Sequence, residues 1–215
     1  MCGQFAIFSN IRAIIDYYNF LNQFEGGFSI EKMHEFLKTK RDKTPYNKYP
    51  FPNEKMTPMN YAPVLIKTSK ASYLDWIRWG LVPAWSNDES FATKLINARI
   101  ETIHEKASFK QAIQKRRALL PVNYFYEWSS ERKPFKIGLK NKEIFSLGVI
   151  WDVWSKTDTD LFSFSIITQE ANAQMKHIHE RMPLIIQPEQ YKDWLNCSDL
   201  SQFQNKQNDF ELQIS

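Results

Sequence analysis

Four short stretches of the sequence place ionisable or amide side chains in apolar or strand-like surroundings. They are "MCG" at 1–3, "INARIET" at 96–102, "YFYEW" at 124–128 and "HIHERMP" at 177–183. Together they supply a thiol, an amide, a carboxylate, imidazoles and guanidinium groups, which nucleophilic and acid–base chemistry uses. Each stretch is therefore a candidate for chemistry.

Cys2 follows the initiator methionine directly. If Met1 is removed, Cys2 becomes the N-terminal residue and carries an α-amine and a thiol on one backbone unit. The α-amine has an ordinary pKa of about 7.7 to 8.0 and the thiol one of about 8.5, so both nucleophiles are partly available at neutral pH. No internal residue offers this pair. Taken alone, however, a thiol at this position is more often of no consequence.

Glu127 and Asn97 each have a plain interpretation. Alternation along the aromatic run turns Glu127 toward solvent in the simplest case. A carboxylate held against Tyr126 and Trp128 would instead have its charged form disfavoured, which raises its pKa toward the range that a proton shuttle needs. Taken singly, Asn97 is more often a turn amide and Arg99 a surface cation.

A metal site is the weakest interpretation of these residues. His177 and His179 stand two residues apart and could be combined with Cys2 and Glu127 as ligands. No CxxC or HExxH spacing accompanies them. We therefore expect no metal and no other cofactor.

Composition describes a globular chain rich in aromatic side chains. The 215 residues are 43% hydrophobic and 15% aromatic, including 7 Trp, with a net charge of +4 that permits an anionic partner without demanding one. Two cysteines give no disulfide framework and indicate a reducing compartment. The sequence shows neither a signal-peptide pattern nor an apolar run of about 18 residues. These features predict a cytoplasmic protein that does not cross a membrane.

The elements that must position the candidate residues divide into an N-terminal helical part and a strand-rich remainder. Apolar spacing predicts helices over 11–24 and 29–38, and the proline-rich stretch 39–58 predicts a loop. From about residue 62 short β-type runs follow one another, and they are interrupted by helical patterns near 104–116, 170–177 and 188–196.

Strands that are mostly adjacent in sequence predict an α+β fold. We expect a mainly antiparallel, barrel-like β-sheet core flanked by a few helices. No boundary divides residues 1–197, which we interpret as one domain, and residues 198–215 are interpreted as a loosely attached C-terminal tail. The protein is expected to be a monomer.

Taken in order along the chain, a set of motifs resembles those of one family. The motifs are "MCG" at 1–3, "NYAP" at 60–63, "WGLVPAW" at 79–85, "NARIET" at 97–102, "LLPVNYFYEW" at 119–128 and "HERMP" at 179–183. They resemble the SRAP family, the SOS response-associated peptidases or abasic-site processing proteins. The resemblance runs from residue 2 to about residue 195. Chance agreement of so many motifs in one order is negligible.

The resemblance implies chemistry at four positions. Members of the family lose the initiator methionine and capture abasic sites in single-stranded DNA with the exposed cysteine, which here is Cys2. The carboxylate of the "EW" motif, Glu127, would shuttle protons. His179 of "HERMP" would help to open the sugar, and Asn97 would hold the α-amine or a substrate oxygen by hydrogen bonds.

The resemblance also implies contacts with the DNA strand. Arg99 and Arg181 match positions that contact phosphates, and phosphate contacts position a strand without reading its sequence. Trp85 matches an aromatic residue near the bound strand, on which a base could stack. Asn60 and Pro63 fall in a segment of the same channel.

Three departures from the family pattern concern the rim of that channel. Gln4 stands where the family commonly has arginine, so the DNA affinity is expected to be lower or redistributed. Val64 stands where threonine is usual, and the segment 22–58 is longer than in compact members. The four chemical positions are unchanged.

Two alternatives from other classes remain open at this point. In an N-terminal-nucleophile amidase or peptidase, Cys2 would attack an amide carbonyl with its own α-amine as base and Asn97 in the oxyanion hole. In a binding module for single-stranded DNA, Cys2 would be inert. The resemblance favours covalent capture, with self-processing and a β-elimination (lyase) reaction as accompanying activities.

Overall fold

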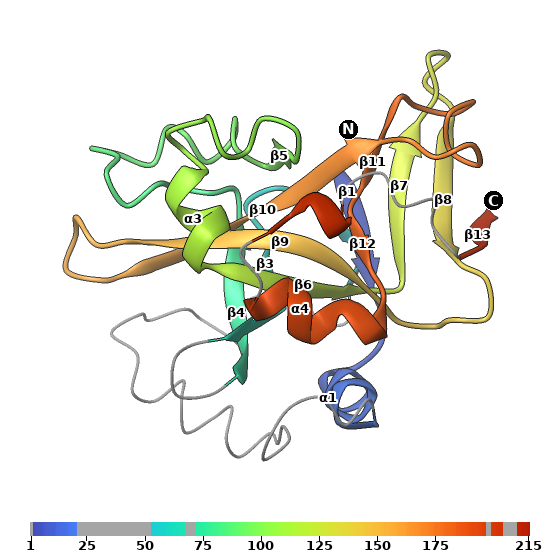
Figure 1. Cartoon of the computed structure of the whole chain (residues 1–215), viewed down its shortest axis with the longest axis horizontal. Coiled ribbons are helices and arrows are strands. Elements are labelled where there is room, and N and C mark those ends of the chain that lie inside the picture. The colour runs from blue at the N-terminus through green and yellow to red at the C-terminus, as the bar shows by residue number, and fades with distance from the viewer. Residues whose placement is uncertain (1, 21–52, 68–71, 197–198, 204–209) are drawn as a thin grey trace.

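Two β-sheets make up most of the computed structural model, which describes residues 2–20, 53–67, 72–196, 199–203 and 210–215 (Figure 1). The strands are β1 (Gln4–Ile7), β2 (Asn53–Met56), β3 (Tyr61–Lys67), β4 (Ser72–Trp79), β5 (Asn97–Arg99), β6 (Arg117–Val122), β7 (Tyr124–Trp128), β8 (Pro134–Leu139), β9 (Phe145–Trp154), β10 (Leu161–Glu170), β11 (Arg181–Pro183), β12 (Ile185–Ile186) and β13 (Leu212–Ile214). The helices are α1 (Ile11–Phe20), α3 (Lys110–Lys115) and α4 (Tyr191–Asn196), with short 3-10 turns η1 (Pro188–Gln190) and η2 (Ser201–Phe203).

A closed barrel forms the centre of the larger sheet. Strand β3 pairs with β4 and β6, β6 with β9, β9 with β10, and β10 returns to β4. All of these pairs are antiparallel except β10–β4, and the short strand β5 also runs parallel to β10. Closure leaves the barrel strands without free edges. The predicted α+β fold with a mainly antiparallel, barrel-like core and few helices is confirmed.

The smaller sheet places the start of the chain at its interior. Its strand order is β13-β8-β7-β1-β2, with every pair antiparallel. Strand β1 is therefore hydrogen-bonded on both sides, by β7 and by β2. Along β7 the side chains of Phe125 and Glu127 are buried, whereas Tyr124, Tyr126 and Trp128 are half-buried. This alternation is the period of two that strand geometry imposes.

Apolar packing joins the two sheets into one core. Every residue of β6 is buried, as is nearly all of β9, because these strands lie inside the barrel wall and are covered on both faces. Helix α4 packs against β6, and its Trp194 Nε1–H donates to the Ala118 carbonyl at 2.9 Å. One continuous cluster includes Phe5 and Phe125 of the smaller sheet and Leu119 of the barrel.

Several predicted elements differ from the structure. Of the helix expected over 104–116, only Lys110–Lys115 is helical. No helix forms over 170–177: β10 runs to Glu170, and residues 173–178 form hydrogen-bonded turns, at the start of which the Asn172 side chain accepts the Met175 N–H at 3.0 Å. The predicted helix over 29–38 lies outside the described residues. The helix over 188–196 is confirmed as η1 followed by α4.

Two strands, β2 and β13, were not predicted from the local sequence and form by pairing with strands that are distant in the chain. The end of the predicted loop 39–58 forms β2, where Met56 is the partner of Phe5 in β1; the residues of that loop before 53 lie outside the described part. The predicted tail ends in β13, which pairs with β8 and buries Leu212. The last residues of the chain are therefore bound to the sheet and not loosely attached.

Candidate active site

Cys2 precedes the interior strand β1 and is completely buried. Its thiol donates to the Gln4 carbonyl at 3.5 Å, and the residue belongs to the continuous core cluster. Because β1 is paired on both sides, the backbone that carries Cys2 enters the molecule between β7 and β2. In Figure 1 the start of the chain lies beside the ends of β10 and β11.

The surroundings of Cys2 keep its thiol protonated at neutral pH. Burial, with a smaller contribution from the negative charge of Glu127, raises the pKa of the thiol to about 12. The thiolate is the nucleophilic form. A reaction of this thiol therefore needs a base that takes its proton as the new bond forms.

Asn97 at the start of β5 reaches Cys2 directly. Its Nδ2–H donates to the Cys2 carbonyl at 2.8 Å. Its Oδ1 is buried and has no hydrogen-bond partner among the described residues. A buried acceptor of this kind costs free energy unless a donor reaches it. Asn97 thus offers an acceptor beside Cys2 to an incoming amine or hydroxyl group.

Glu127 is buried on the inner face of β7, with an exposed fraction of 2%. The pairing of Gln4 with Tyr126 aligns the residues before β1 with the end of β7, and Glu127 acts electrostatically on Cys2. Its Oε1 accepts the Trp128 N–H at 3.3 Å. The simplest interpretation, which turned Glu127 to solvent, is wrong, because the aromatic residues beside it take the outer face.

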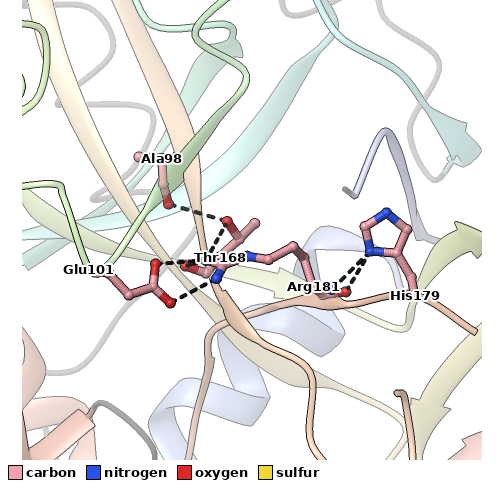
Figure 2. Close-up of polar contacts among 5 residues, drawn as sticks. All are labelled: Ala98, Glu101, Thr168, His179 and Arg181. Carbon is pink, nitrogen blue, oxygen red and sulfur yellow. Dashed lines mark hydrogen bonds and ion pairs between the residues drawn. The ribbon is translucent and has the colours of Figure 1, made fainter. Parts of the chain in front are cut away.

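His179 lies in the turn that leads into β11. The Arg181 backbone N–H donates to its Nδ1 at 2.9 Å, and the same nitrogen lies 3.3 Å from the Arg181 carbonyl oxygen. The neutral tautomer in which Nδ1 accepts the Arg181 N–H carries its proton on Nε2. Figure 2 shows the ring on the side away from the Glu101 carboxylate and toward the ribbon of the first residues, and Figure 1 likewise places the start of the chain beside β11. The ring can therefore present an N–H donor without first gaining a proton.

Arg181 is held by several acceptors at the end of β10. Its two terminal nitrogens donate to the Glu101 carboxylate at 2.8 and 2.9 Å, and Nη2 also donates to the Thr168 carbonyl at 2.8 Å (Figure 2). Burial by itself would raise the pKa of Glu101, and the hydrogen bonds and charge of Arg181 bring it below its ordinary value. Arg181 keeps a buried Nε–H that has no partner among the described residues.

Arg99 and Trp85 lie farther out. Arg99 closes β5 opposite Thr168, and its side chain is exposed. Trp85 follows β4 in the loop 80–96 and is half exposed, the only large apolar side chain of the described residues that is exposed. Its indole packs edge-on against Phe91. The two residues thus present a cation and an aromatic ring to solvent.

Asn60 and Pro63 have local structural contacts. The Asn60 Oδ1 accepts the Thr57 N–H at 3.1 Å and closes the turn before β3. Pro63 is buried within β3, where its partner is Trp76. This burial argues for a place in the barrel wall rather than for direct contact with a strand, and the predicted role of both residues in a DNA channel stays a prediction.

Glu101 is a site residue that single-residue reasoning missed. It stands in the quoted motif "NARIET", two residues after Arg99, but the sequence gives no sign that it pairs with Arg181, which lies 80 positions away. Thr168, whose carbonyl holds the same guanidinium, was not singled out either. Only the pairing of β10 with β5 and β11 brings these residues together.

The described ranges hold neither a cluster of metal ligands nor a membrane-spanning helix. No group of three or more His, Cys, Asp or Glu side chains there is placed to hold a metal ion. None of the helices in those ranges has the length and apolar character of a membrane span. Cys197 lies outside the described residues.

The chain matches one protein family and several proteins that are named abasic site processing proteins. Residues 1–213 match the model of the family described as SOS response associated peptidase (SRAP). The chain is 33% identical over 206 residues to the abasic site processing protein YoaM of Bacillus subtilis, covering 94% of this chain and 82% of that protein. It is 27% identical over 154 residues to the abasic site processing protein YedK of Escherichia coli, covering 70% of this chain and 68% of that protein.

A solved structure shares the fold. A crystal structure of a protein from Bacteroides thetaiotaomicron superposes with a TM-score of 0.76 and covers 99% of this chain and 91% of that one. The two sequences are 23% identical. The fold is therefore found in a chain of quite different sequence.

Proposed function

The chain belongs to the SRAP family, and on that premise we propose that it processes abasic sites in single-stranded DNA by linking them covalently to Cys2. Similar proteins are named abasic site processing proteins. The observation that carries the proposal is the group formed by Cys2 and Glu127, which are buried, and Asn97, which is half-buried with a buried Oδ1; the three side chains come from distant parts of the chain.

The proposed reaction begins once Met1 is removed and the α-amine of Cys2 is free. The ring-opened abasic sugar is an aldehyde, and the amine adds to its carbonyl carbon to form a carbinolamine. Loss of water gives the Schiff base. The sulfur then bonds to the imine carbon while the imine nitrogen gains a proton, which closes a five-membered thiazolidine. One water leaves in all, and no oxidant or cofactor takes part.

Glu127 serves as the proton carrier of this sequence. Burial raises the pKa of the Cys2 thiol, so the proton of the thiol leaves as the carbon–sulfur bond forms. A buried carboxylate near the thiol can take that proton and return it to the nitrogen. The same group in its acid form can protonate the departing hydroxyl of the carbinolamine.

His179 and Asn97 assist at the oxygens and at the nitrogen. The Nε2–H of His179 is suited to donate to the sugar ring oxygen while the ring opens, because its Nδ1 is already occupied by the Arg181 N–H. The Asn97 Oδ1, which has no hydrogen-bond partner within the described ranges, is suited to accept from the freed α-amine and so to hold it near Cys2. Neither role requires a change in net charge.

Contacts outside this group would hold the strand. Arg99 and Arg181 would bind phosphates, and Trp85 would stack on a base for about 1 to 3 kcal/mol. The covalent link would shield the abasic site from strand cleavage during the response to DNA damage. A Schiff base also permits β-elimination, so a lyase reaction is expected as a minor outcome, and self-processing would account for the family's description as peptidases.

Intact mass measurement tests the proposal. The purified protein is weighed alone and after incubation with a single-stranded oligonucleotide that contains one abasic site. We expect a mass without Met1, and then an adduct whose mass is the sum of protein and oligonucleotide less one water. A protein that lacks Met1 but forms no adduct would overturn the proposal.

The same sample separates the two alternatives. An amidase would hydrolyse an amide substrate in the absence of DNA and would lose this activity when the thiol is blocked. A binding module would retain full affinity for the strand after the thiol is blocked and would never form an adduct. Covalent capture requires the thiol and the abasic site together.

A further inference from the structure

Side chains of β9 and β10 form hydrogen bonds with the backbone of the segment that carries Trp85. Three alternating positions of the segment 82–86 take part in these hydrogen bonds: the Val82 N–H donates to Ser163 Oγ at 2.8 Å, the Ala84 N–H donates to Asp152 Oδ2 at 2.9 Å, and Trp154 Nε1–H donates to the Ser86 carbonyl at 2.8 Å. The positions between them, Pro83 and Trp85, are free of these bonds. We call the three side chains of Asp152, Trp154 and Ser163 the loop clamp.

Strand register explains why the loop clamp acts as one unit. Asp152 of β9 and Ser163 of β10 are direct cross-strand partners, and Trp154 lies two residues beyond Asp152 on the same face of β9. All three side chains are buried, with exposed fractions of 5% or less. The clamp is therefore part of the barrel wall and is as rigid as the β9–β10 pairing.

Asp152 is the charged member of the clamp and the most extensively bonded. Its Oδ1 accepts the Val153 N–H at 2.8 Å and forms an ion pair with Arg116 Nη1 at 2.5 Å. The Arg116 guanidinium in turn lies 5.8 Å from the centre of the Trp151 ring. Both carboxylate oxygens are thus occupied, and Asp152 has little freedom to follow a moving loop.

Trp85 lies between two of the residues that the loop clamp binds, and its indole is exposed. The indole is 50% exposed, packs edge-on against Phe91, and approaches the Ala107 carbonyl at 3.4 Å through Nε1. A stacking platform binds a base more tightly when it is held in place beforehand, because less freedom is lost on binding. The bonds beneath residues 82–86 supply that restraint.

We propose that Asp152, with Ser163, is a positioning residue that holds Trp85 as a preformed stacking platform for one unpaired base. This inference rests on the proposed function, since it assigns Trp85 to the strand. Asp152 acts through the loop and has no part in the chemistry at Cys2.

Fluorescence polarisation with a labelled single-stranded oligonucleotide that lacks an abasic site tests the coupling. We expect Asp152→Ala to weaken binding about tenfold and Ser163→Ala about threefold, in line with the loss of one or two hydrogen bonds. In a Trp85→Ala background neither change should weaken binding by more than about twofold. Equal losses with and without Trp85 would overturn the proposal.

Ser165→Ala is the matched control. Ser165 is a buried serine two residues along β10, its Oγ has no partner among the described residues, and it does not contact the segment 82–86 through any hydrogen bond described there. We expect binding unchanged in this variant. If Ser163→Ala and Ser165→Ala behave alike, the proposal fails, and this comparison stands even if Asp152→Ala does not fold.

A readout on the indole separates this inference from the proposed function. The Trp85 indole N–H resonance, identified by its absence in Trp85→Phe, should show increased motion by heteronuclear NOE in Ser163→Ala and not in Ser165→Ala. If Trp85→Ala leaves oligonucleotide binding unchanged, the stacking role in the proposed function is wrong, whereas the NOE still decides whether the clamp holds the ring. An unchanged NOE in Ser163→Ala would contradict the clamp itself.

Discussion

The two parts of the candidate site differ in how they are held and in how they meet solvent. The reactive floor, which consists of Cys2, Asn97 and Glu127, is enclosed by strands of both sheets, and Cys2 and Glu127 are almost fully buried. The outer rim, which consists of Trp85 and Arg99, projects from a loop and from the end of a short strand. Burial raises the pKa of the Cys2 thiol in the floor, whereas exposure leaves the rim side chains available to a partner.

This contrast separates the chemistry from the binding of the strand. Groups in a dry interior interact strongly and have shifted pKa values, so they suit proton transfer. Exposed cations and rings are screened by water and salt and suit reversible contact with a long polyanion. Variants of the floor should therefore change the covalent step, and variants of the rim should change affinity.

The largest expected effect is that of Cys2→Ala. The covalent species should disappear completely, because no other residue supplies an adjacent amine and thiol, while affinity for the strand should remain within a few-fold of the unmodified protein. Gel shift under denaturing and native conditions measures the two quantities on one sample. An undiminished denaturant-resistant adduct would remove Cys2 from the mechanism.

Glu127→Gln should slow adduct formation by about 100-fold, which is the lower end of the range for loss of a general acid–base group. Quenched time courses at saturating oligonucleotide give the rate constant. Glu131→Gln is the control, because Glu131 is an exposed carboxylate in the turn after β7. If Glu127→Gln changes affinity and leaves the rate constant unchanged, the division between floor and rim is wrong.

The raised pKa of the Cys2 thiol predicts a pH-dependent stability. The folded protein keeps the thiol protonated up to about pH 12, whereas the unfolded chain ionises it above about 9, so the unfolded state binds fewer protons between these values. The contribution of the thiol to stability is therefore fully present below pH 9. It falls by about 1.4 kcal/mol for each pH unit above that.

Urea unfolding of the unmodified protein and of Cys2→Ser at pH 8, 9.5 and 10.5 measures this loss. The free energy of unfolding of the unmodified protein should fall relative to that of Cys2→Ser as the pH rises. Buried tyrosines such as Tyr18 and Tyr191, whose pKa values burial also raises, are common to both proteins and cancel. A difference that stays constant over this range would mean that the thiol is not held in a dry interior.

The smallest effect is expected at the rim. Arg99→Gln should weaken binding a few-fold on every oligonucleotide sequence and reduce the slope of log affinity against log salt by about 0.7, as the loss of one phosphate contact does. Arg181→Gln should change the slope less, because Glu101 already balances the charge of Arg181. Salt titrations on two unrelated sequences check both variants, and a loss on one sequence only would contradict phosphate contact.

Strands were predictable where the local pattern is strong. Within the region of short β-type runs that was expected from about residue 62, residues 117–122 form β6 and residues 124–128 form β7. Short elements were not predictable: β5 has three residues, and it exists as a strand because it pairs with β10. Such a stretch has no periodicity of its own to detect.

The identity of the chemical residues was predictable from the motifs, but their environment was not. The sequence alone left the direction of Glu127 open, because aromatic residues that border it suit either face of a sheet. The pairing of β7 between β1 and β8 decides it and turns the carboxylate inward. The pairing of Arg181 with Glu101 likewise depends on strands that are distant in sequence.

The sequence by itself determined the residue types at the site, the family to which the chain belongs, and the strand pattern of the barrel, since motifs and alternation are local properties. Only the tertiary structure decided that the thiol is buried, that the charge of Glu127 acts on it, that no donor among the described residues reaches Asn97 Oδ1, and that the barrel wall holds the loop of Trp85. Burial, pKa and hydrogen-bond partners depend on which segments meet in space, and that depends on the packing of the whole chain.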